Sequence, residues 1–389
     1  MRTVTLPVAY MPLVDAAPLI VAREMGFDHA EGISLDMRPA PSWSSLRDML
    51  AFGHVDAAHL LSPVPVAMAL GLGGIATPLS AVSVLSLNGN VIGVGTRLAG
   101  RLTDQGYGFD FSDAAAAGSA LAKATGDVLV FGVPFPFSMH VELLRYWVAG
   151  TELASKQVEI RTVPPPLMAQ ALAGGEIDAF CVGEPWGSYA ADDNVGALLL
   201  PGKAIWTCAP EKVLAVRNDW AETEPHLLGS LMRAVWKAGR WLSKADSRTT
   251  ASEMLSRKAY LNVSPELIDR ALMGEFTISA SGEQRQVDGF VEFFDGAASF
   301  PWRSQAKWIA HQLAKRNGID VSTAERQAAR VFRSDLYRRE LVGLGVETPG
   351  ASEKLEGALP ESIAVASVNG SLILPPNVFF DRRIFEPAG

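Results

Sequence analysis

Strand-like and helix-like segments alternate from residue 3 to about residue 215, and this alternation restricts the fold more than any other feature. The strand-like segments are short apolar runs, and several of the helix-like segments end at a glycine. The strands are expected at 3–10, 33–40, 55–61, 127–135, 158–163 and 177–183, and the helices at 17–27, 42–53, 139–150 and 165–175. This pattern predicts an α/β fold in which helices cover sheets.

A short internal similarity indicates two related halves. Residues 50–58 read LAFGHVDAA and residues 172–180 read LAGGEIDAF. In both, a glycine ends a helix and an aspartate leads into a short strand, which runs into a proline-containing loop. Because ligands in open α/β sheets bind outside the carboxyl ends of the strands, we expect two similar lobes whose strand ends face one cleft.

Beyond about residue 215 the pattern changes to helices and then to an irregular tail. Helical segments are expected at 225–244, 265–274, 304–318 and 323–345. The last 40 or so residues have the irregular composition of an extended tail. We expect these helices and the tail to pack against the first lobe.

Charge and hydropathy exclude several classes of partner. The chain has 34 Lys and Arg against 42 Asp and Glu, a net charge of −8, whereas a large nucleic-acid interface needs clustered cations. No apolar run reaches the roughly 18 residues of a membrane span. The opening MRTVTLPVAYMP lacks the long apolar segment and cleavage site of a secretory signal. The sequence therefore predicts a cytoplasmic protein with no membrane and no direct nucleic-acid partner.

The chain also lacks the motifs of the common catalytic and metal sites. Its two cysteines, Cys181 and Cys208, show neither CxxC nor metal-ligand spacing. They can pair in principle, but the count fits a reducing compartment at least as well. GxSxG, HExxH, Walker A and paired-carboxylate signatures are absent from the sequence. We expect a protein that is not an enzyme and needs no cofactor or metal.

Several blocks, in order along the chain, resemble the nitrate- and bicarbonate-binding proteins of the NrtA/CmpA type. They are YMPLVDAAPL, PSWSSLRDMLAFGHVDAAHLLSPVP, SLNGNVIGV, PFPFSMHVELLRYWVAG, VPPPLMAQALAGGEIDAFCVGEPW and PEKVLAVRNDW. The resemblance covers roughly residues 3–340 and implies a two-lobed, periplasmic-binding-protein-like fold of type II. It places lobe I at 1–85 plus 205–340 and lobe II at 86–204. The tail, 341–389, would then wrap lobe I.

The same resemblance implies a nitrate site of four main residues. Trp43 matches the tryptophan whose ring walls the anion, and His140 matches a histidine near a helix start. Lys212 matches the lysine that supplies the positive charge, from a position just before a strand. Asn90 stands where the family's nitrate binders have glutamine, so its amide reaches about one methylene less. We expect Lys212→Ala to give a folded protein that no longer binds nitrate.

Other positions are implied less directly. Ser62 and Pro63 stand where the family has a Thr-Pro pair, and a hydroxyl or amide there could touch an anion oxygen. Gly89 would let the backbone approach the ligand. Pro166, the last of three consecutive prolines, would stiffen a pocket edge. Glu184 is expected beside the hinge, because a carboxylate placed directly on an anion would repel it.

Within this family the chain resembles the NasS-type branch, soluble nitrate/nitrite sensors that lack an export signal. That likeness implies an ANTAR-type RNA-binding antiterminator (NasT-like) as partner, held until nitrate or nitrite binds. The alternative is the nitrate-binding subunit of an ABC-type importer. A thiamine-pyrimidine synthase on the same fold would need a cysteine-rich run, which this chain lacks. Bicarbonate binders use acidic residues with a metal, and we expect no acidic cluster at the pocket.

Overall fold

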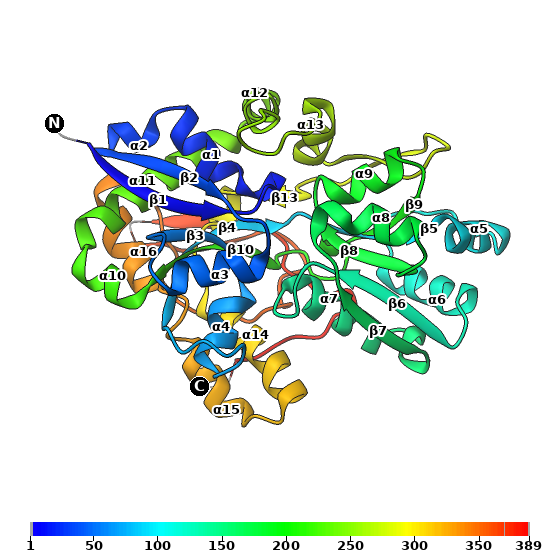
Figure 1. Ribbon diagram of the computed structural model, residues 1–389. Coiled ribbons are helices and arrows are strands. Elements are labelled where there is room, and N and C mark those ends of the chain that lie inside the picture. Colours follow the sequence, from blue (N-terminus) through cyan, green and yellow to red (C-terminus); the bar gives the residue numbers. More distant parts are fainter. Residues whose placement is uncertain (1–2, 369, 388–389) are drawn as a thin grey trace.

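Two mixed sheets form the cores of two lobes in the computed structural model, which describes residues 3–368 and 370–387 (Figure 1). The sheet of lobe I has the order β13-β4-β10-β3-β1-β2. Its strands are β1 (Val4–Tyr10), β2 (Ile33–Pro39), β3 (Ala57–Leu61), β4 (Leu79–Asn88), β10 (Pro210–Arg217) and β13 (Val291–Glu292). β1 is parallel to β2 and β3, whereas β10 runs antiparallel between β3 and β4.

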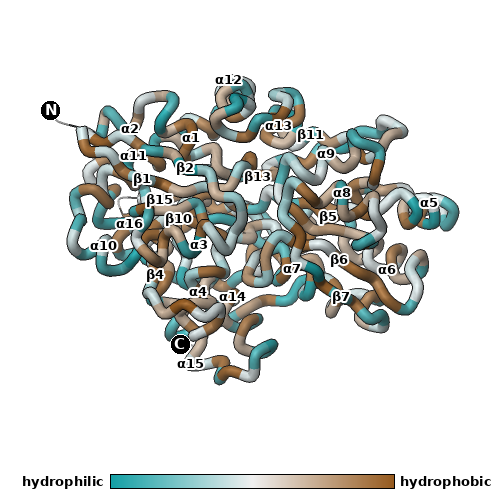
Figure 2. The backbone as a smooth tube through the Cα atoms, viewed as in Figure 1, coloured by the Kyte–Doolittle hydropathy of each residue, from teal (hydrophilic) through white to brown (hydrophobic). Residues whose placement is uncertain are grey.

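The sheet of lobe II repeats this plan with five strands in the order β7-β6-β8-β5-β9. The strands are β5 (Asn90–Gly95), β6 (Val128–Val133), β7 (Gln157–Thr162), β8 (Ala179–Gly183) and β9 (Gly196–Pro201). β6 is parallel to β7 and β8, and β5 is antiparallel to β8 and β9. The strands of both sheets are mostly hydrophobic along the inside of each lobe (Figure 2).

Two connections join the sheet of lobe I to the sheet of lobe II. β4 ends at Asn88 and β5 begins at Asn90, so a single residue, Gly89, joins the two sheets. Gly89 has φ of 95°, and a Cβ there would lie 3.2 Å from Val291, so a side chain would strain the crossing. The return runs from β9 through a short 3₁₀ turn, Gly202–Ala204, into β10.

Helices cover the faces of both sheets. In lobe I these are α1 (Ala17–Glu24), α2 (Phe27–Ala30), α3 (Trp43–Ala51), α4 (Pro63–Ala69), α10 (Asn218–Thr223), α11 (Pro225–Leu242), α12 (Ala245–Leu255), α13 (Pro265–Met273), α14 (Arg303–Asn317), α15 (Val321–Ala328) and α16 (Ser334–Leu341). In lobe II they are α5 (Thr96–Asp104), α6 (Ala114–Ala124), α7 (Met139–Ala149), α8 (Met168–Ala173) and α9 (Trp186–Asp192). Along the described chain, none of the helices combines the length and the apolar character needed to cross a membrane.

Hydroxyl caps fix the start of two helices that lead to the site. Ser42 accepts a hydrogen bond from the Ser45 amide at the start of α3, and Ser138 accepts one from Val141 at the start of α7. Such caps satisfy backbone donors that the first turn leaves free. Each helix therefore begins at a fixed residue, which places Trp43 and His140 in their first turns.

The helical segment expected at 323–345 is instead broken into α15 and α16. Between them, Phe332 forms a β-bridge with Ala81 of β4, and Val331 and Arg333 exchange backbone hydrogen bonds with Ala81. This pairing extends the backbone where the sequence continues a helical pattern. No element was predicted for the stretch that forms α12.

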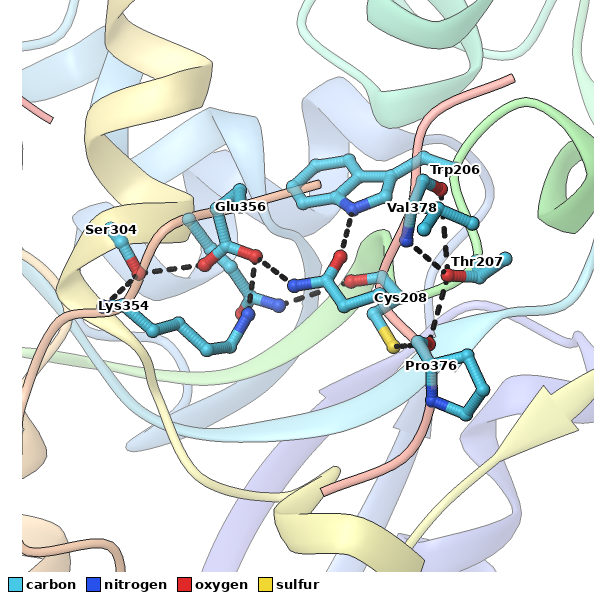
Figure 3. A network of polar contacts seen from close by, with 10 residues as sticks. Trp206, Thr207, Cys208, Ser304, Lys354, Glu356, Pro376 and Val378 are labelled. Carbon is cyan, nitrogen blue, oxygen red and sulfur yellow. Dashed lines mark hydrogen bonds and ion pairs between the residues drawn. The ribbon is translucent and has the colours of Figure 1, made fainter. Parts of the chain in front are cut away.

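The C-terminal tail includes two small hairpin strands, β14 (Ile363–Ala366) and β15 (Ser371–Leu374), and a buried polar network (Figure 3). A further hairpin, β11 (Glu275–Thr277) with β12 (Gln284–Gln286), precedes it in the chain. In the network, Asn377 donates to Glu356 at 2.6 Å and accepts from the Trp206 indole at 2.7 Å. The tail then reaches lobe II, because the Tyr146 hydroxyl of α7 bonds Asp381.

Candidate functional site

A cluster of buried polar side chains lies where the two lobes meet. We call it the junction cluster, and each of its side chains is at most 2% exposed. Lobe I supplies residues from the 3₁₀ turn Val14–Ala16, from α3, from β3 and from β10, and lobe II supplies residues from β5 and α7. The members are Asp15, Trp43, His59, Asn90, His140, Glu211 and Lys212.

Lys212 is the cation of the junction cluster. Its Nζ lies 2.7 Å from Asp15 Oδ2 and 2.8 Å from Glu211 Oε1, and 5.4 Å from the centre of the Trp43 ring. Burial alone would lower the pKa of Lys212, but the two carboxylates raise it above its ordinary value. The ammonium therefore stays charged inside the protein.

Glu211 of lobe I contacts two side chains of lobe II. Its carboxylate accepts a hydrogen bond from Asn90 Nδ2 at 2.6 Å, and Oε1 lies 3.2 Å from His140 Nδ1. Asn90 and His140 come from lobe II, whereas Glu211 and Lys212 come from lobe I. One flat carboxylate thus contacts three of the groups that the sequence analysis assigned to nitrate.

The expectation of no acidic cluster at the pocket is wrong, because Asp15 and Glu211 both contact Lys212. Lys212 also lies within β10 rather than before a strand. In a regular strand, neighbouring side chains point to opposite faces. The pairing of β10 with β4 shifts register on both sides of Lys212, and such a bulge redirects side chains. Glu211 and Lys212 therefore reach the same cluster.

The two histidines are held uncharged by burial. His59 Nε2 lies 3.0 Å from Asp15 Oδ1, and burial lowers the pKa of His59 although Asp15 opposes this. Burial likewise lowers the pKa of His140 to about 4, with Glu211 opposing. For Asp15, burial raises the pKa, but Lys212 and His59 outweigh burial and hold it well below its usual range. Near neutral pH the cluster thus has two neutral imidazoles as potential donors.

Several buried polar atoms at the junction have no hydrogen-bond partner. They include the Trp43 indole Nε1, His140 Nε2 and the Ser86 hydroxyl, which lies on β4 opposite Lys212. An unpaired buried polar group costs roughly 1–3 kcal/mol, so such groups in a folded protein call for an explanation. Donors of this kind around a cation suit a small polar ligand with several acceptor oxygens.

The remaining predicted site residues lie outside the junction cluster. The buried Ser62 hydroxyl donates to the Pro210 carbonyl at 2.5 Å, so it fixes the start of β10, and Pro63 begins α4. Gly89 is the crossing residue between the sheets. Pro166 is exposed on the 3₁₀ turn Pro165–Leu167 and does not belong to the buried cluster.

Glu184 lies at the crossing rather than among the donors of the cluster. Its amide donates to the Gly89 carbonyl at 3.2 Å, and its own carbonyl accepts from the Val14 amide at 2.9 Å. Its buried carboxylate accepts from the Ser188 amide. Burial raises the pKa of Glu184 to about 7, although the Ser188 hydrogen bonds oppose this. Glu184 is therefore a titratable group beside the hinge.

Neither cysteine forms a disulfide. Cys181 and Cys208 are both free and buried, and the Cys181 thiol lies 4.0 Å from Asn90 Oδ1. In the part of the chain that the structure describes, no group of three or more His, Cys, Asp and Glu side chains is arranged to hold a metal ion. The two acidic groups of the junction cluster, Asp15 and Glu211, instead share one ammonium, that of Lys212.

Comparison with known proteins identifies the family. The model of the NMT1-like family matches residues 2–256. The chain is 30% identical over 353 residues to the nitrate/nitrite binding protein NrtA of Synechocystis, covering 88% of this chain and 77% of NrtA. It is 27% identical over 358 residues to the bicarbonate-binding protein CmpA of Synechococcus elongatus, covering 88% of this chain and 79% of CmpA.

The chain is also similar to one longer protein and to one solved structure. The chain is 32% identical over 356 residues to the nitrate import ATP-binding protein NrtC of Synechocystis, which is 89% of this chain but only 51% of NrtC. The crystal structure of the periplasmic nitrate-binding protein NrtA from Synechocystis superposes with a TM-score of 0.82 at 25% identity, covering 99% of this chain and 96% of that one. The predicted two-lobed, periplasmic-binding-protein-like fold is thus confirmed. The chain belongs to the NMT1-like family, among the substrate-binding proteins of the NrtA/CmpA type.

Proposed function

We propose that this chain binds nitrate or nitrite at the junction cluster. The observation that carries the proposal is the set of contacts around the Glu211 carboxylate. It accepts hydrogen bonds from Lys212 of lobe I and Asn90 of lobe II, and it lies 3.2 Å from His140 Nδ1 of lobe II. A carboxylate is flat, carries one negative charge and presents acceptor oxygens, and nitrate and nitrite share these properties. The groups that hold Glu211 are therefore chemically suited to a small flat oxyanion.

Binding then requires a change in the cluster, because two carboxylates already offset one ammonium. Two like charges about 4 Å apart repel by ~4 kcal/mol at an effective dielectric constant of 20. An incoming anion therefore displaces the Glu211 carboxylate from its contacts, or its binding is coupled to the uptake of a proton from water by His140. Three or four charge-assisted hydrogen bonds, less the cost of desolvation and ordering, correspond to micromolar affinity, roughly −8 kcal/mol.

The anion would act as a signal because donors from both lobes contact it. Such a ligand favours the closed arrangement of the lobes over an open one. We propose that in the cytoplasm the open arrangement holds an ANTAR-type RNA-binding antiterminator and that nitrate or nitrite releases it. By reciprocity the antiterminator weakens anion binding. The support for this part is the resemblance to NasS-type sensors.

Two other functions have specific support. The similarity to NrtA and to NrtC favours the nitrate-binding subunit of an ABC-type importer. The similarity to CmpA, together with the acidic groups beside Lys212, favours bicarbonate as an alternative ligand. These functions differ from the sensor in partner or in ligand, so one set of binding measurements separates them.

Calorimetric titration with nitrate, nitrite, bicarbonate and chloride tests the ligand. We expect micromolar binding of nitrate or nitrite, and binding of bicarbonate alone would replace the proposed ligand. Size-exclusion chromatography with an ANTAR-type antiterminator, with and without nitrate, tests the partner. A complex that nitrate dissociates supports the sensor, whereas no complex in either condition favours the importer subunit.

A further inference from the structure

A cavity lies on the side of the molecule where the lobes and the tail meet, outside the junction cluster. It has a volume of about 680 Å³. Its walls come from α7 of lobe II, from α14 of lobe I and from the tail between Phe379 and Phe385. This volume is within the range of small-molecule sites, about 300–1,000 Å³.

The cavity is lined by more cations than anions. Arg145, Lys315, Arg316 and Arg383 line it, whereas Glu142 is its one acidic lining residue within the described chain. Arg316 already pairs with Glu142 and donates a hydrogen bond of 2.8 Å to each of its carboxylate oxygens. Arg383 lies 3.3 Å from Asp381, so the excess positive charge of the cavity comes from Arg145 and Lys315.

Arg145 and Lys315 are the cavity cations for which no hydrogen bond or ion pair is found within the described chain, and both are exposed. Arg145 lies on α7, the helix that also carries Glu142. Partial burial, and then the charge of Arg316, lower the pKa of Arg145, whereas Glu142 opposes this. Because Arg316 already pairs with Glu142, an incoming anion offsets the charge of Arg145.

Aromatic side chains form the apolar part of the wall. Trp308 stacks on Phe379 with ring centres 5.8 Å apart and an interplanar angle of 21°. Tyr146 lies 5.1 Å from Phe379 and 5.9 Å from Trp308. Phe385 of the tail completes this wall. Trp308 and Phe379 are almost fully buried, so a flat ligand ring would contact the half-buried rings of Tyr146 and Phe385. Arginine binds carboxylate and phosphate groups through two parallel hydrogen bonds.

We propose that this cavity binds a small ligand that combines a flat ring with a carboxylate or phosphate group, and that Arg145 binds the anionic group. The site is separate from the junction cluster, and it does not require that the chain bind nitrate. Its walls come from both lobes and from the tail, so the ligand stabilises the arrangement of the lobes shown in Figure 1.

The experiment uses the full chain and the probe 8-anilinonaphthalene-1-sulfonate, which has flat rings and one anionic group. Its fluorescence is titrated in the wild type, in Arg145→Met and in Arg97→Met. Arg97 is a matched control because it lies on α5 of the same lobe, is 80% exposed and does not line the cavity. Adenosine monophosphate and benzoate then compete with the bound probe, one supplying a phosphate and the other a carboxylate.

We expect saturable binding of one probe per chain in the wild type and in Arg97→Met. Loss of a charge-assisted hydrogen bond should weaken binding about tenfold or more in Arg145→Met. Displacement by adenosine monophosphate alone identifies a phosphate ligand, and displacement by benzoate alone identifies a carboxylate. Equal affinity in all three proteins, or displacement by neither competitor, overturns the proposal.

Discussion

Replacing Lys212 by methionine should destabilise the protein strongly. Lys212 is fully buried and is the ammonium group that contacts both Asp15, at 2.7 Å, and Glu211, at 2.8 Å. Methionine has a similar length but no charge, so the variant buries two carboxylates with no cation between them. Breaking a buried ion pair in this way costs about 3–5 kcal/mol of unfolding free energy. The sequence-based expectation that Lys212→Ala leaves the fold intact is therefore revised to a large loss of stability.

The control is Lys237→Met. Lys237 also pairs with a carboxylate, Glu31, but its side chain is 30% exposed. An ion pair of this kind contributes about 0–1 kcal/mol. Urea denaturation of the wild type and both variants at pH 8 measures the difference. A loss below about 1 kcal/mol in Lys212→Met, or a loss equal to that of Lys237→Met, would show that the buried carboxylates do not depend on Lys212.

The pH dependence gives a second readout of the same variant. In the wild type the pKa of Asp15 is held below its usual range. The stability that ionised Asp15 contributes is therefore fully present above the ordinary pKa of an aspartate, and it is lost as the pH falls into the strongly acid range. Without Lys212, burial raises the pKa of Asp15. The loss of stability from burying this ionised carboxylate is then largest at high pH and disappears toward about pH 4, where the carboxyl is protonated. The difference between the two proteins should therefore be smaller at pH 5 than at pH 8.

Three further predictions concern other carboxylates and the tail. Glu184 has its pKa raised from 4.5 to about 7, so the wild type should lose roughly 3 kcal/mol of stability as pH rises from 4.5 to 7. Glu184→Gln should lack this loss, and parallel urea profiles of the two proteins would contradict the assignment. Glu211→Gln should bind nitrate at least about tenfold more tightly by calorimetry, because the competing negative charge is gone; unchanged affinity would exclude competition at this position. Asn377→Ala should cost about 2–4 kcal/mol in urea denaturation, since it leaves buried groups of Glu356 and Trp206 without partners. A loss within 0.5 kcal/mol or so would mean that water replaces the amide.

Much of the architecture could be predicted from the sequence because the relevant signals are local. The capped start of α3 and the apolar runs of β1 and β3 are visible as residue patterns. The break between α15 and α16 could not be predicted, since it depends on Phe332 pairing with Ala81, a residue about 250 positions away. Tertiary hydrogen bonds override local helical preference there.

Part of the candidate site was predictable because the sequence resembles a known family. The resemblance pointed to Trp43, Asn90, His140 and Lys212, and the fold brings these four side chains together. The carboxylates were missed because their positions depend on backbone irregularities. Glu211 shares the cluster with its neighbour Lys212 only because β10 is bulged. Asp15 lies in a loop-like stretch, LVDAAP, whose sequence does not indicate where the carboxylate points.

A crystal structure of the chain grown with nitrate most directly tests whether the junction cluster binds the anion. We expect a flat anion within hydrogen-bond distance of Lys212 Nζ, His140 and Asn90, with the Glu211 carboxylate moved away from at least two of them. This expectation would be contradicted if nitrate were absent from the junction and Glu211 kept its contacts with all three donors.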